Sequence, residues 1–317
     1  MALPTARDVR PVDPVLTNLS LGFKNPRFLW DQICPPVKVD QQTGTYFNFT
    51  RDYWFRIPNA VGSRRAPGAA YQKADFGVSS ATYRADERGY EKSVDDVTRA
   101  ASQVPGSLDA MATEFLTNLI QMELELDAAA AAFVTGVWGT STTLAGGDQW
   151  SDLANSDPIS DADVASRTIR RNTGAKPDVL LVGALGWEVL KEHPVLLDKY
   201  KHTQKGILTE DLVASALGLK TVVIGDSVKN TAAEGAAFAG ADVWTDNAVF
   251  FKRTESPGLL VPNGAYTFVW DEKGNYPWAI ESYRDEPTRS DVQRIFTHYV
   301  MSIVASQYGY MYLDTNA

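Results

Sequence analysis

Two short stretches of the sequence could carry chemistry, because each sets polar or glycine residues directly after an apolar run. The first, VVIGDSV, contains Gly225, Asp226 and Ser227. A serine in such a position is a nucleophile only where a histidine base activates it. The second, VGALGWE, sets Gly183 and Gly186 between a predicted strand and a predicted helix. It lacks the paired Gly-x-Gly that lets backbone approach a pyrophosphate, so it indicates a tight strand-to-helix turn.

The serine stretch looks like the nucleophile block of GDS-type esterases. Those enzymes carry the block near the start of the domain and activate its serine with a late Asp-x-x-His pair. In this sequence the residues three positions ahead of the three histidines are Leu190, Lys199 and Ile295. Because no base is supplied, the sequence predicts no enzyme and no catalytic residue, and it predicts that Ser227→Ala has no effect. An α/β esterase-type enzyme stays the alternative from a different functional class.

Metal and cofactor binding are not predicted either. His193, His202 and His298 show no ligand spacing to one another or to Cys34, the single cysteine. His193 precedes a proline and is interpreted as the cap of a helix. Residues 139–164 hold five aspartates but lack the alternating ladder, turn glycine and terminal glutamate of a calcium loop. That segment is predicted to be a polar loop.

Composition excludes further classes of protein. The chain has 317 residues, 44% of them hydrophobic and 22% charged, which is typical of a soluble globular protein with two lobes or one lobe and extensions. A net charge of −9 argues against tight wrapping of nucleic acid. The N-terminal MALPTARDVRPVDP lacks the apolar helix of a signal peptide, and no apolar run reaches the roughly 20 residues that span a bilayer. The sequence therefore predicts a cytosolic protein with no membrane partner.

The elements that must position any functional surface begin with an arm and a hairpin. Five prolines in residues 11–36 predict an extended arm without regular helix. The following TYFNFTRDYWFRI alternates, and one face collects Phe47, Phe49, Tyr53, Phe55 and Ile57. A Gly/Pro-rich tip carries Arg64, Arg65 and Lys73, and a second strand-like stretch returns from it. Such a ribbon is marginally stable alone, so it either folds back on its own domain or lies on another subunit.

A long helix is predicted for residues 107–134, beginning at Ser107 and ending before Gly136. Apolar residues at spacings of three and four predict its buried face: Leu108, Met111, Phe115, Leu119, Met122, Leu126, Ala129 and Phe133. Acidic residues are predicted on its outer side: Glu114, Glu123, Glu125 and Asp127. They form either a solvated face or a docking surface.

A compact α/β lobe is predicted next, with strands at PDVLLV, KTVVIGD and ADVWTDNAVFFKR and helices at GALGWEVLKEHP and LTEDLVASALG. The chain then returns with AYTFVWD, PWAIESYRDE and a long apolar stretch over 291–313. In its first part, DVQRIFTHYVMSIV, periodicity alone favours a helix, whereas the Ile, Val, Tyr and Phe content favours a strand.

This order of elements resembles the tailed-phage major capsid proteins of the Hong Kong 97 type, an α+β fold. The stretch DPVLTNLSLGFKNPRFLWDQICPPVKVDQQTGTYF looks like the family's N-terminal arm leading into the hairpin. KPDVLLVGALGWEVLKEHPVLLDKYKHTQKGILTEDLVASALGLKTVVIGDSVKNTA is similar to its axial lobe, and VWTDNAVFFKRTESPGLLVPNGAYTFVW to the return into its peripheral domain. No single motif is diagnostic, and the specificity comes from the order of the stretches.

The resemblance implies a division of the chain into four parts and favours a strand over DVQRIFTHYVMSIV, residues 291–304. The parts are a 1–44 arm, a 45–97 extended hairpin loop, a peripheral domain of 98–162 and 254–317 with 107–134 as its spine helix, and a 163–253 axial domain. The family implies that the hairpin reaches over a neighbouring subunit. We therefore expect the tip to dock on the acid-bearing side of a neighbour's long helix, with the aromatic face supplying most of the binding. No covalent crosslink through Lys73 is predicted, because no partner asparagine can be assigned.

The resemblance also implies a function and partners. The chain is expected to self-assemble through pentamers and hexamers into the icosahedral head shell of a bacteriophage, assembled in the host cytoplasm and located in the virion. Because the sequence begins at the arm, a separate scaffolding protein is expected, together with a portal, decoration proteins and weakly held double-stranded DNA. Encapsulin nanocompartments share the fold, so a cargo-holding bacterial shell stays open as an alternative.

Overall fold

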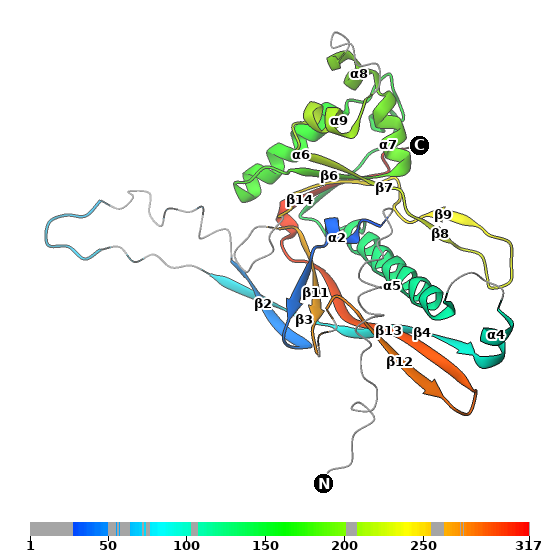
Figure 1. Ribbon diagram of the computed structural model, residues 1–317. Coiled ribbons are helices and arrows are strands. Elements are labelled where there is room, and N and C mark those ends of the chain that lie inside the picture. The colour runs from blue at the N-terminus through cyan, green and yellow to red at the C-terminus, as the bar shows by residue number, and fades with distance from the viewer. Residues whose placement is uncertain are drawn as a thin grey trace.

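The computed structural model describes residues 28–49, 55, 57, 64–71, 73, 77–102, 107–200, 208–254, 263–272, 274 and 276–316. Two five-stranded sheets and one long helix organise this part of the chain (Figure 1). One sheet lies beside the long helix, and we call this part the peripheral lobe after the predicted division of the chain. The other sheet carries four helices, and we call that part the axial lobe in the same way.

The peripheral sheet has the order β1-β11-β13-β12, with β4 paired to the other side of β13. Its strands are β1 (Pro36–Val39), β4 (Asp86–Asp95), β11 (Ala265–Trp270), β12 (Ala279–Asp285) and β13 (Ser290–Ile303). β13 is antiparallel to β4, β11 and β12. The strand predicted within 291–313 is therefore confirmed, and the helix that periodicity alone favoured is wrong. Strand pairing favours the strand over the helix, because β13 exchanges backbone hydrogen bonds with neighbouring strands along both of its edges.

The predicted long helix is confirmed as α5 (Leu108–Ala132), with Ser107 at its N-cap position. Its predicted buried face is wrong at Met111 and Phe115, which are 46% and 53% exposed, whereas Ala129 is buried and Met122, Leu126 and Phe133 pack against the core. The neighbouring stripe is buried instead: Ala112, Leu116, Ile120, Leu124 and Ala128. Apolar residues follow both stripes at helical spacing, so the sequence pattern did not distinguish them. The small alanines let the sheets approach the helix closely, and packing selects their stripe.

The axial sheet has the order β5-β14-β10-β6-β7. Its strands are β5 (Thr140–Thr143), β6 (Val179–Gly183), β7 (Thr221–Gly225), β10 (Ala248–Phe251) and β14 (Gly309–Leu313). Four helices cover one face: α6 (Pro158–Thr173), α7 (Ala184–Glu192), α8 (Pro194–Tyr200) and α9 (Glu210–Leu217). Alternate residues divide the two faces, because Leu180 packs in the helical core whereas Leu181 packs in the core shared with α5. The two lobes thus share buried surface through this sheet.

Two of the predictions fail in the axial lobe. Residues 139–164 are not a loop, because they contain β5, the 3-10 helix η1 (Gly146–Asp148) and the beginning of α6. Asp157 caps α6 by accepting from the amides of Ile159 and Ser160 at 3.0 and 3.2 Å, and Pro158 opens the helix. In addition, β5 and β14 lie in the axial sheet, although the predicted division placed both in the peripheral domain.

The described end of the predicted arm packs on the chain's own core. It forms the short helix α2 (Trp30–Ile33) and then β1, which runs parallel to β11. Phe28, Trp30 and Ile33 are at most 7% exposed. The prolines of this segment follow α2 rather than interrupt it, so the prediction of no regular helix is wrong at this point.

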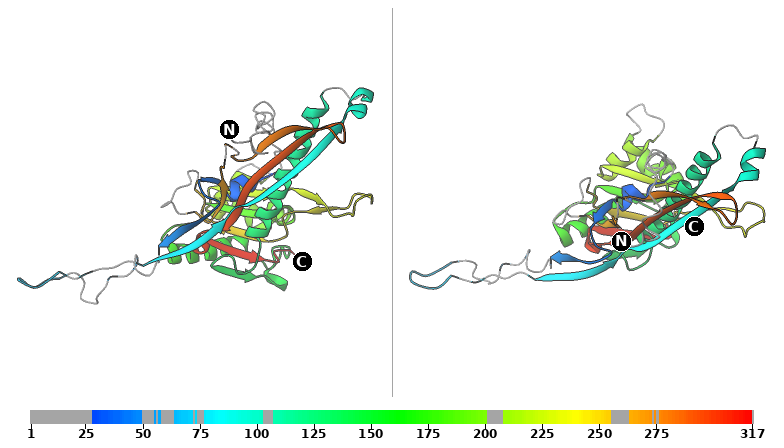
Figure 2. Two further views of the ribbon diagram at one scale, coloured as in Figure 1. Left: turned by 90° about the horizontal axis from the view of Figure 1, so that it is seen from below. Right: turned by 60° about the horizontal axis from the view of Figure 1, so that its bottom comes forward.

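The remaining elements project from the body. They are the hairpin of β2 (Thr43–Phe49) and β3 (Val78–Arg84), the hairpin of β8 (Val228–Asn230) and β9 (Gly240–Asp242), and α4 (Asp96–Ala101). The 3-10 helix η2 (Ser306–Tyr308) does not project, since it contacts α6. Figure 2 shows the β2–β3 side and the far end of β12, β13 and β4 pointing in opposite directions. The chain is therefore elongated, with one extension at each end of the peripheral lobe.

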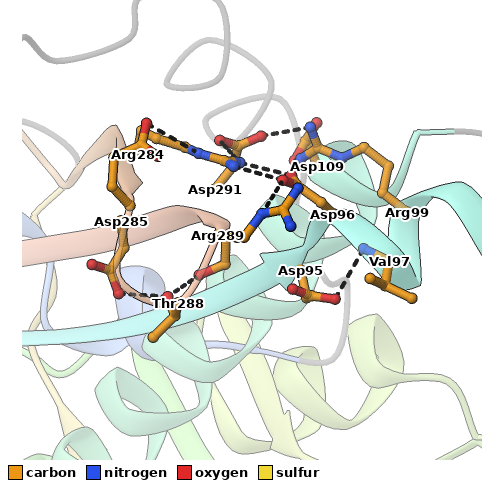
Figure 3. A network of polar contacts seen from close by, with 12 residues as sticks. Asp95, Asp96, Val97, Arg99, Asp109, Arg284, Asp285, Thr288, Arg289 and Asp291 are labelled. Carbon is orange, nitrogen blue, oxygen red and sulfur yellow. Dashed lines mark hydrogen bonds and ion pairs between the residues drawn. The ribbon is translucent and has the colours of Figure 1, made fainter.

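Arginine–aspartate pairs hold the end opposite the hairpin (Figure 3). Arg284 on β12 pairs with Asp96 on α4 and Asp291 on β13 at 2.6 and 3.1 Å. Arg99 on α4 pairs with Asp291 and with Asp109 at the beginning of α5, at 2.5 and 2.9 Å. These guanidinium groups hold the pKa values of Asp96 and Asp291 below their usual range. Helices and strands distant in the sequence are thereby tied at one corner of the molecule.

Candidate functional site

The β2–β3 hairpin is held at its base and exposed farther out. The strands pair from Thr43 with Arg84 to Phe49 with Val78. Tyr46 and Tyr83 stack on Phe268 of β11, with ring centroids 5.5 and 4.8 Å apart. Aromatic stacking thus anchors the base on the peripheral sheet, and the predicted hairpin is confirmed for β2 and β3. The predicted loop of 45–97 is wrong over β4, which pairs with β13 in the peripheral sheet.

The predicted contact residues of the hairpin face solvent where the structure describes them. Phe47 is 54% exposed and Phe55 is 66% exposed. Arg64, Arg65 and Lys73 are also exposed. Tyr53 and the side chain of Phe49 lie outside the described residues.

The described part of the tip is a shaped turn. The amide of Ala69 donates to the carbonyl of Ala66 at 3.1 Å, and Gly68 has φ +79°. Proline followed by glycine at the two central positions is typical of a type II turn. The guanidinium of Arg65 lies 4.3 Å from the ring centroid of Tyr71, which is 78% exposed. The tip therefore presents cations and an aromatic ring together.

The four acids predicted on the outer side of α5 have three different surroundings. Glu114 is exposed. Glu123 and Asp127 pair with Arg88 of β4 in the same chain, at 2.9 and 2.5 Å. Asp127 also accepts from the hydroxyl of Tyr299 at 2.9 Å. Arg88 therefore already neutralises two of the acids that were expected to receive a neighbour's tip.

Glu125 contradicts the prediction directly, because its side chain is fully buried. One carboxylate oxygen accepts from the backbone amides of Leu29 and Trp30, both at 2.8 Å. The other accepts from the indole nitrogen of Trp244 at 2.7 Å and from the hydroxyl of Ser227 at 3.0 Å. Burial raises the pKa of this carboxyl group, and these hydrogen bonds oppose that rise. Glu125 therefore stabilises the interior of its own subunit and is not available to a partner.

Charge spacing could not have distinguished Glu125 from Glu123. The signal that could have done so is that Glu125 continues a line of buried polar residues four apart on α5: Thr113, Thr117, Gln121 and Glu125. Four polar residues at helical spacing indicate one face of α5, and that face is turned away from Glu123 and Asp127.

The serine stretch of β7 has a structural role. Ser227 is fully buried and donates its hydrogen bond to the Glu125 carboxylate. The serine hydroxyl donates directly to the carboxylate. Nucleophilic catalysis of this type requires a histidine base between the serine and the acid, and none lies between Ser227 and Glu125. We therefore revise the prediction for Ser227→Ala and expect a loss of stability, since the substitution would leave a buried acceptor with one donor fewer.

A serine–histidine contact that the sequence did not predict lies in the axial lobe. Ser156 Oγ is 2.9 Å from His193 Nε2, and both residues are buried. The amide of Val195 donates to His193 Nδ1 at 3.3 Å, which leaves the proton of a neutral imidazole on Nε2. Ser156 donates to the carbonyl of Asp152 at 2.8 Å. The imidazole therefore donates its hydrogen bond to the serine hydroxyl, whereas a nucleophilic serine must donate its proton to the imidazole.

Other chemistry finds little support in the described residues. They contain no group of three or more His, Cys, Asp or Glu side chains placed to hold a metal ion. Two surface hollows, of about 330 and 460 Å³, flank α7 and hold no histidine or cysteine. In the same part of the chain, no helix is both long enough and apolar enough to cross a membrane.

No family model matches the chain. The major capsid protein of Burkholderia phage BcepMu is 29% identical to it over 222 residues, which cover 69% of this chain and 70% of that protein. The chain is a homologue of phage major capsid proteins. This agrees with the resemblance that the order of its sequence stretches predicts.

Solved structures agree on the fold. A phage-related protein from Bordetella bronchiseptica matches with a TM-score of 0.77 and 23% identity, over 96% of this chain and 98% of that one. The capsid of cyanophage P-SCSP1u matches with a TM-score of 0.61 and 10% identity, over 92% of this chain and 89% of that one. The predicted α+β fold of the Hong Kong 97 type is confirmed.

Proposed function

We propose that this chain is a major capsid protein that self-assembles through pentamers and hexamers into an icosahedral head shell around phage DNA. The observation that carries the proposal is a ribbon anchored at its base but bare beyond it, in a homologue of phage major capsid proteins. Exposed aromatic side chains on an extended element are typical of contacts with another chain.

Each part of the chain has a proposed place in that shell. The hairpin within 45–97 reaches over a neighbouring subunit, the lobe around α5 forms the peripheral domain, and the helical lobe forms the axial domain. We place residues 1–44 as an arm, although its described end is anchored in the subunit's own core.

The acceptor surface for the hairpin tip is revised. Glu125 is buried and Glu123 and Asp127 pair with Arg88, so Glu114 is the remaining exposed acid of the four. Phe115 and Met111 lie beside it on α5 and are half exposed. This mixed patch, acidic and apolar, suits a tip that carries both cations and aromatic rings.

We further propose the partners that a head shell needs. They are a separate scaffolding protein, a portal, decoration proteins, and double-stranded DNA held by weak contacts. The net charge of −9 supports the last point, since an acidic wall does not bind the genome tightly. The protein would be assembled in the host cytoplasm and located in the virion.

Two alternatives are less well supported. An encapsulin-like shell uses the same fold, but the homologue at 29% identity is a phage capsid protein. Terminase and portal genes beside this gene would favour the phage shell, and a cargo gene would favour the compartment. An esterase is disfavoured because the hydroxyl of Ser227 donates its hydrogen bond to Glu125 and not to a histidine base.

Negative-stain microscopy of the purified protein, with and without its scaffolding partner, tests the proposal. Rings or closed shells are expected. The double substitution Arg64→Glu, Arg65→Glu should impair assembly while leaving the subunit folded, and its effect should shrink as salt rises, because exposed charges are screened. A clean monomer of the unaltered protein under both conditions would rule out the capsid function.

A further inference from the structure

One side of the axial lobe carries a cluster of cations on α6 and directly after it. We define the α6 face by Val164, Arg167, Arg170, Arg171 and Lys176, all of which are exposed. The buried residues Ala162, Ala165 and Ile169 form the opposite stripe of the same helix, so the cations point away from the lobe. Among the described residues none of these four cations forms an ion pair.

The other side of the lobe is acidic and partly apolar. We define the α7 face by Leu185, Trp187, Glu188, Glu192, Glu210 and Asp211, from α7 and the beginning of α9. Leu185 is 50% exposed, and the four acids are exposed. Trp187, Glu210 and Asp211 line the hollow of about 330 Å³. Ion pairs of these four acids are likewise absent within the described part of the chain.

The two faces lie on opposite sides of one compact lobe. In Figure 1, α6 extends to the left of the axial lobe and α7 lies on its right. The lobe is a single packed core, so the two faces do not reach each other within one copy. The α6 face is mainly basic, although Asp163 is also exposed on this helix, and the α7 face is mainly acidic, although Lys191 lies beside Glu188 and Glu192. A mainly basic and a mainly acidic face on opposite sides are complementary between copies related by a rotation.

We propose that the α6 face of one copy docks on the α7 face of the next copy, so that axial lobes join head to tail and close into a ring. A contact between two different faces continues from copy to copy, and it closes when the rotation divides a full turn. The proposal rests on the proposed capsid function, and it names the surfaces that would build its rings.

The chemistry of the two faces supports this occupant. A guanidinium of the α6 face fits the hollow beside Trp187, where it could stack on the indole and pair with Glu210 or Asp211. Val164, which is 38% exposed, offers an apolar contact for Leu185. Charge complementarity of this kind mainly sets orientation and partner choice. It therefore favours one order of docking and disfavours contacts between two like faces.

Charge reversal tests the pairing. The first variant carries Arg167→Glu, Arg171→Glu and Lys176→Glu, so both of its faces are acidic. The second carries Glu188→Lys, Glu192→Lys and Glu210→Lys, so both of its faces are basic. Each variant alone should lose ring assembly at low salt, because like faces meet. A variant with all six substitutions should regain it and is the matched control for the added mutations.

Mixing the two variants gives a sharper result. Their faces are complementary only between unlike copies, so the mixture should form rings in which the variants alternate. An alternating ring must have an even number of members. Native mass spectrometry should therefore detect six-membered rings and lose five-membered ones. Five-membered rings in the mixture, or normal assembly of either variant alone, would overturn the pairing while leaving the capsid function intact if the unaltered protein assembles.

A second measurement does not depend on those variants folding. Cys34 is the single cysteine, it is fully buried, and burial raises the pKa of its thiol to about 12, so it is unreactive. Arg171→Cys with Glu210→Cys therefore adds the only reactive thiols. In assembled protein a short bis-maleimide should join these copies into a ladder longer than dimers, whereas each single-cysteine variant should give no ladder. Assembled shells without a ladder, or a ladder in a single-cysteine variant, would contradict head-to-tail docking. An unaltered protein that never assembles would instead contradict the capsid function itself.

Discussion

Glu125 of the long helix accepts a hydrogen bond from the indole nitrogen of Trp244 at 2.7 Å, and the two residues are 119 positions apart. The same carboxylate accepts from two amides near α2 and from Ser227. One buried side chain thus ties the end of the arm, α5 and the axial lobe together. A subunit built this way keeps its two lobes in a fixed relation before any neighbour binds.

Replacing Glu125 should destabilise the subunit. In Glu125→Gln one of the two carboxylate oxygens becomes an NH₂ group. Two of the four donors then face this NH₂ group, and only the other two still face an oxygen. Hydrogen bonds to a charged group contribute about 1.5–3 kcal/mol, and buried groups left unpaired cost a similar amount. We expect the free energy of unfolding to fall by about 3 kcal/mol, measured by urea denaturation of unassembled protein.

Glu114→Gln is the matched control, because it makes the same chemical change at an exposed position of the same helix. It should alter the free energy of unfolding by less than about 0.5 kcal/mol. Ser227→Ala removes one of the four donors and should cost about 1–3 kcal/mol. Equal stability of the Glu125 and Glu114 variants would contradict the role of the buried carboxylate.

The choice of buried stripe on α5 can be tested with two neighbouring residues. Leu116 is fully buried, whereas Phe115 is 53% exposed. Leu116→Ala should lower the free energy of unfolding by about 2–5 kcal/mol, the range for removing a buried leucine side chain. Phe115→Ala should cost less than about 1 kcal/mol in the unassembled subunit. The reverse ranking would restore the face that the sequence pattern predicts.

The buried imidazole of His193 predicts a pH dependence in the axial lobe. Burial lowers its pKa below the usual value near 6.5, although Asp157 acts against this. The unfolded chain therefore binds more protons here than the folded chain, and stability falls as the pH drops below about 6.5. Protonation would also place a proton on Nδ1, which accepts from the amide of Val195.

Denaturant titrations between pH 7.5 and about 5 should show that loss of stability, in the range where an unperturbed histidine gains its proton. His193→Gln should be less stable at pH 7.5 yet lack this histidine's part of the slope. Because the two proteins share every other titratable group, the difference between their slopes isolates the imidazole. An identical slope in both proteins would show that His193 does not cause it.

The sequence predicted those helices and strands whose signals lie within the segment itself. β6, α7, α9 and the long α5 were predicted because their apolar periodicity and caps lie within each segment. The choice of strand for β13 came from its β-branched and aromatic content together with the family resemblance. β5 and β14 were not placed in the axial sheet, because parallel pairing between residues 140–143 and 310–313 leaves no local trace.

The candidate site was predictable only in part, for the same reason. The bare aromatic face and cationic tip follow from alternation and from the lack of apolar partners near the tip. Which acid of α5 is buried depends on Trp244 and on the two amides at the beginning of α2, and both are far away in sequence. Charge count along one helix could not report those contacts.

Two adjacent residues of β2 offer the clearest separation between folding and assembly. Tyr46 stacks on Phe268, and Phe47 points to the other side of the ribbon and is 54% exposed. Tyr46→Ala removes an aromatic pair that contributes about 0.5–1.5 kcal/mol beyond its buried area, so it should destabilise the unassembled subunit. Phe47→Ser should leave urea unfolding of that subunit within about 0.5 kcal/mol of the original. In sedimentation of assembled material, however, Phe47→Ser should shift protein from shells to free subunits, because the hairpin's exposed face binds a neighbour. Full assembly of Phe47→Ser would show that this face is not an interface, and a loss of subunit stability as large as that of Tyr46→Ala would show that the ribbon folds onto its own chain.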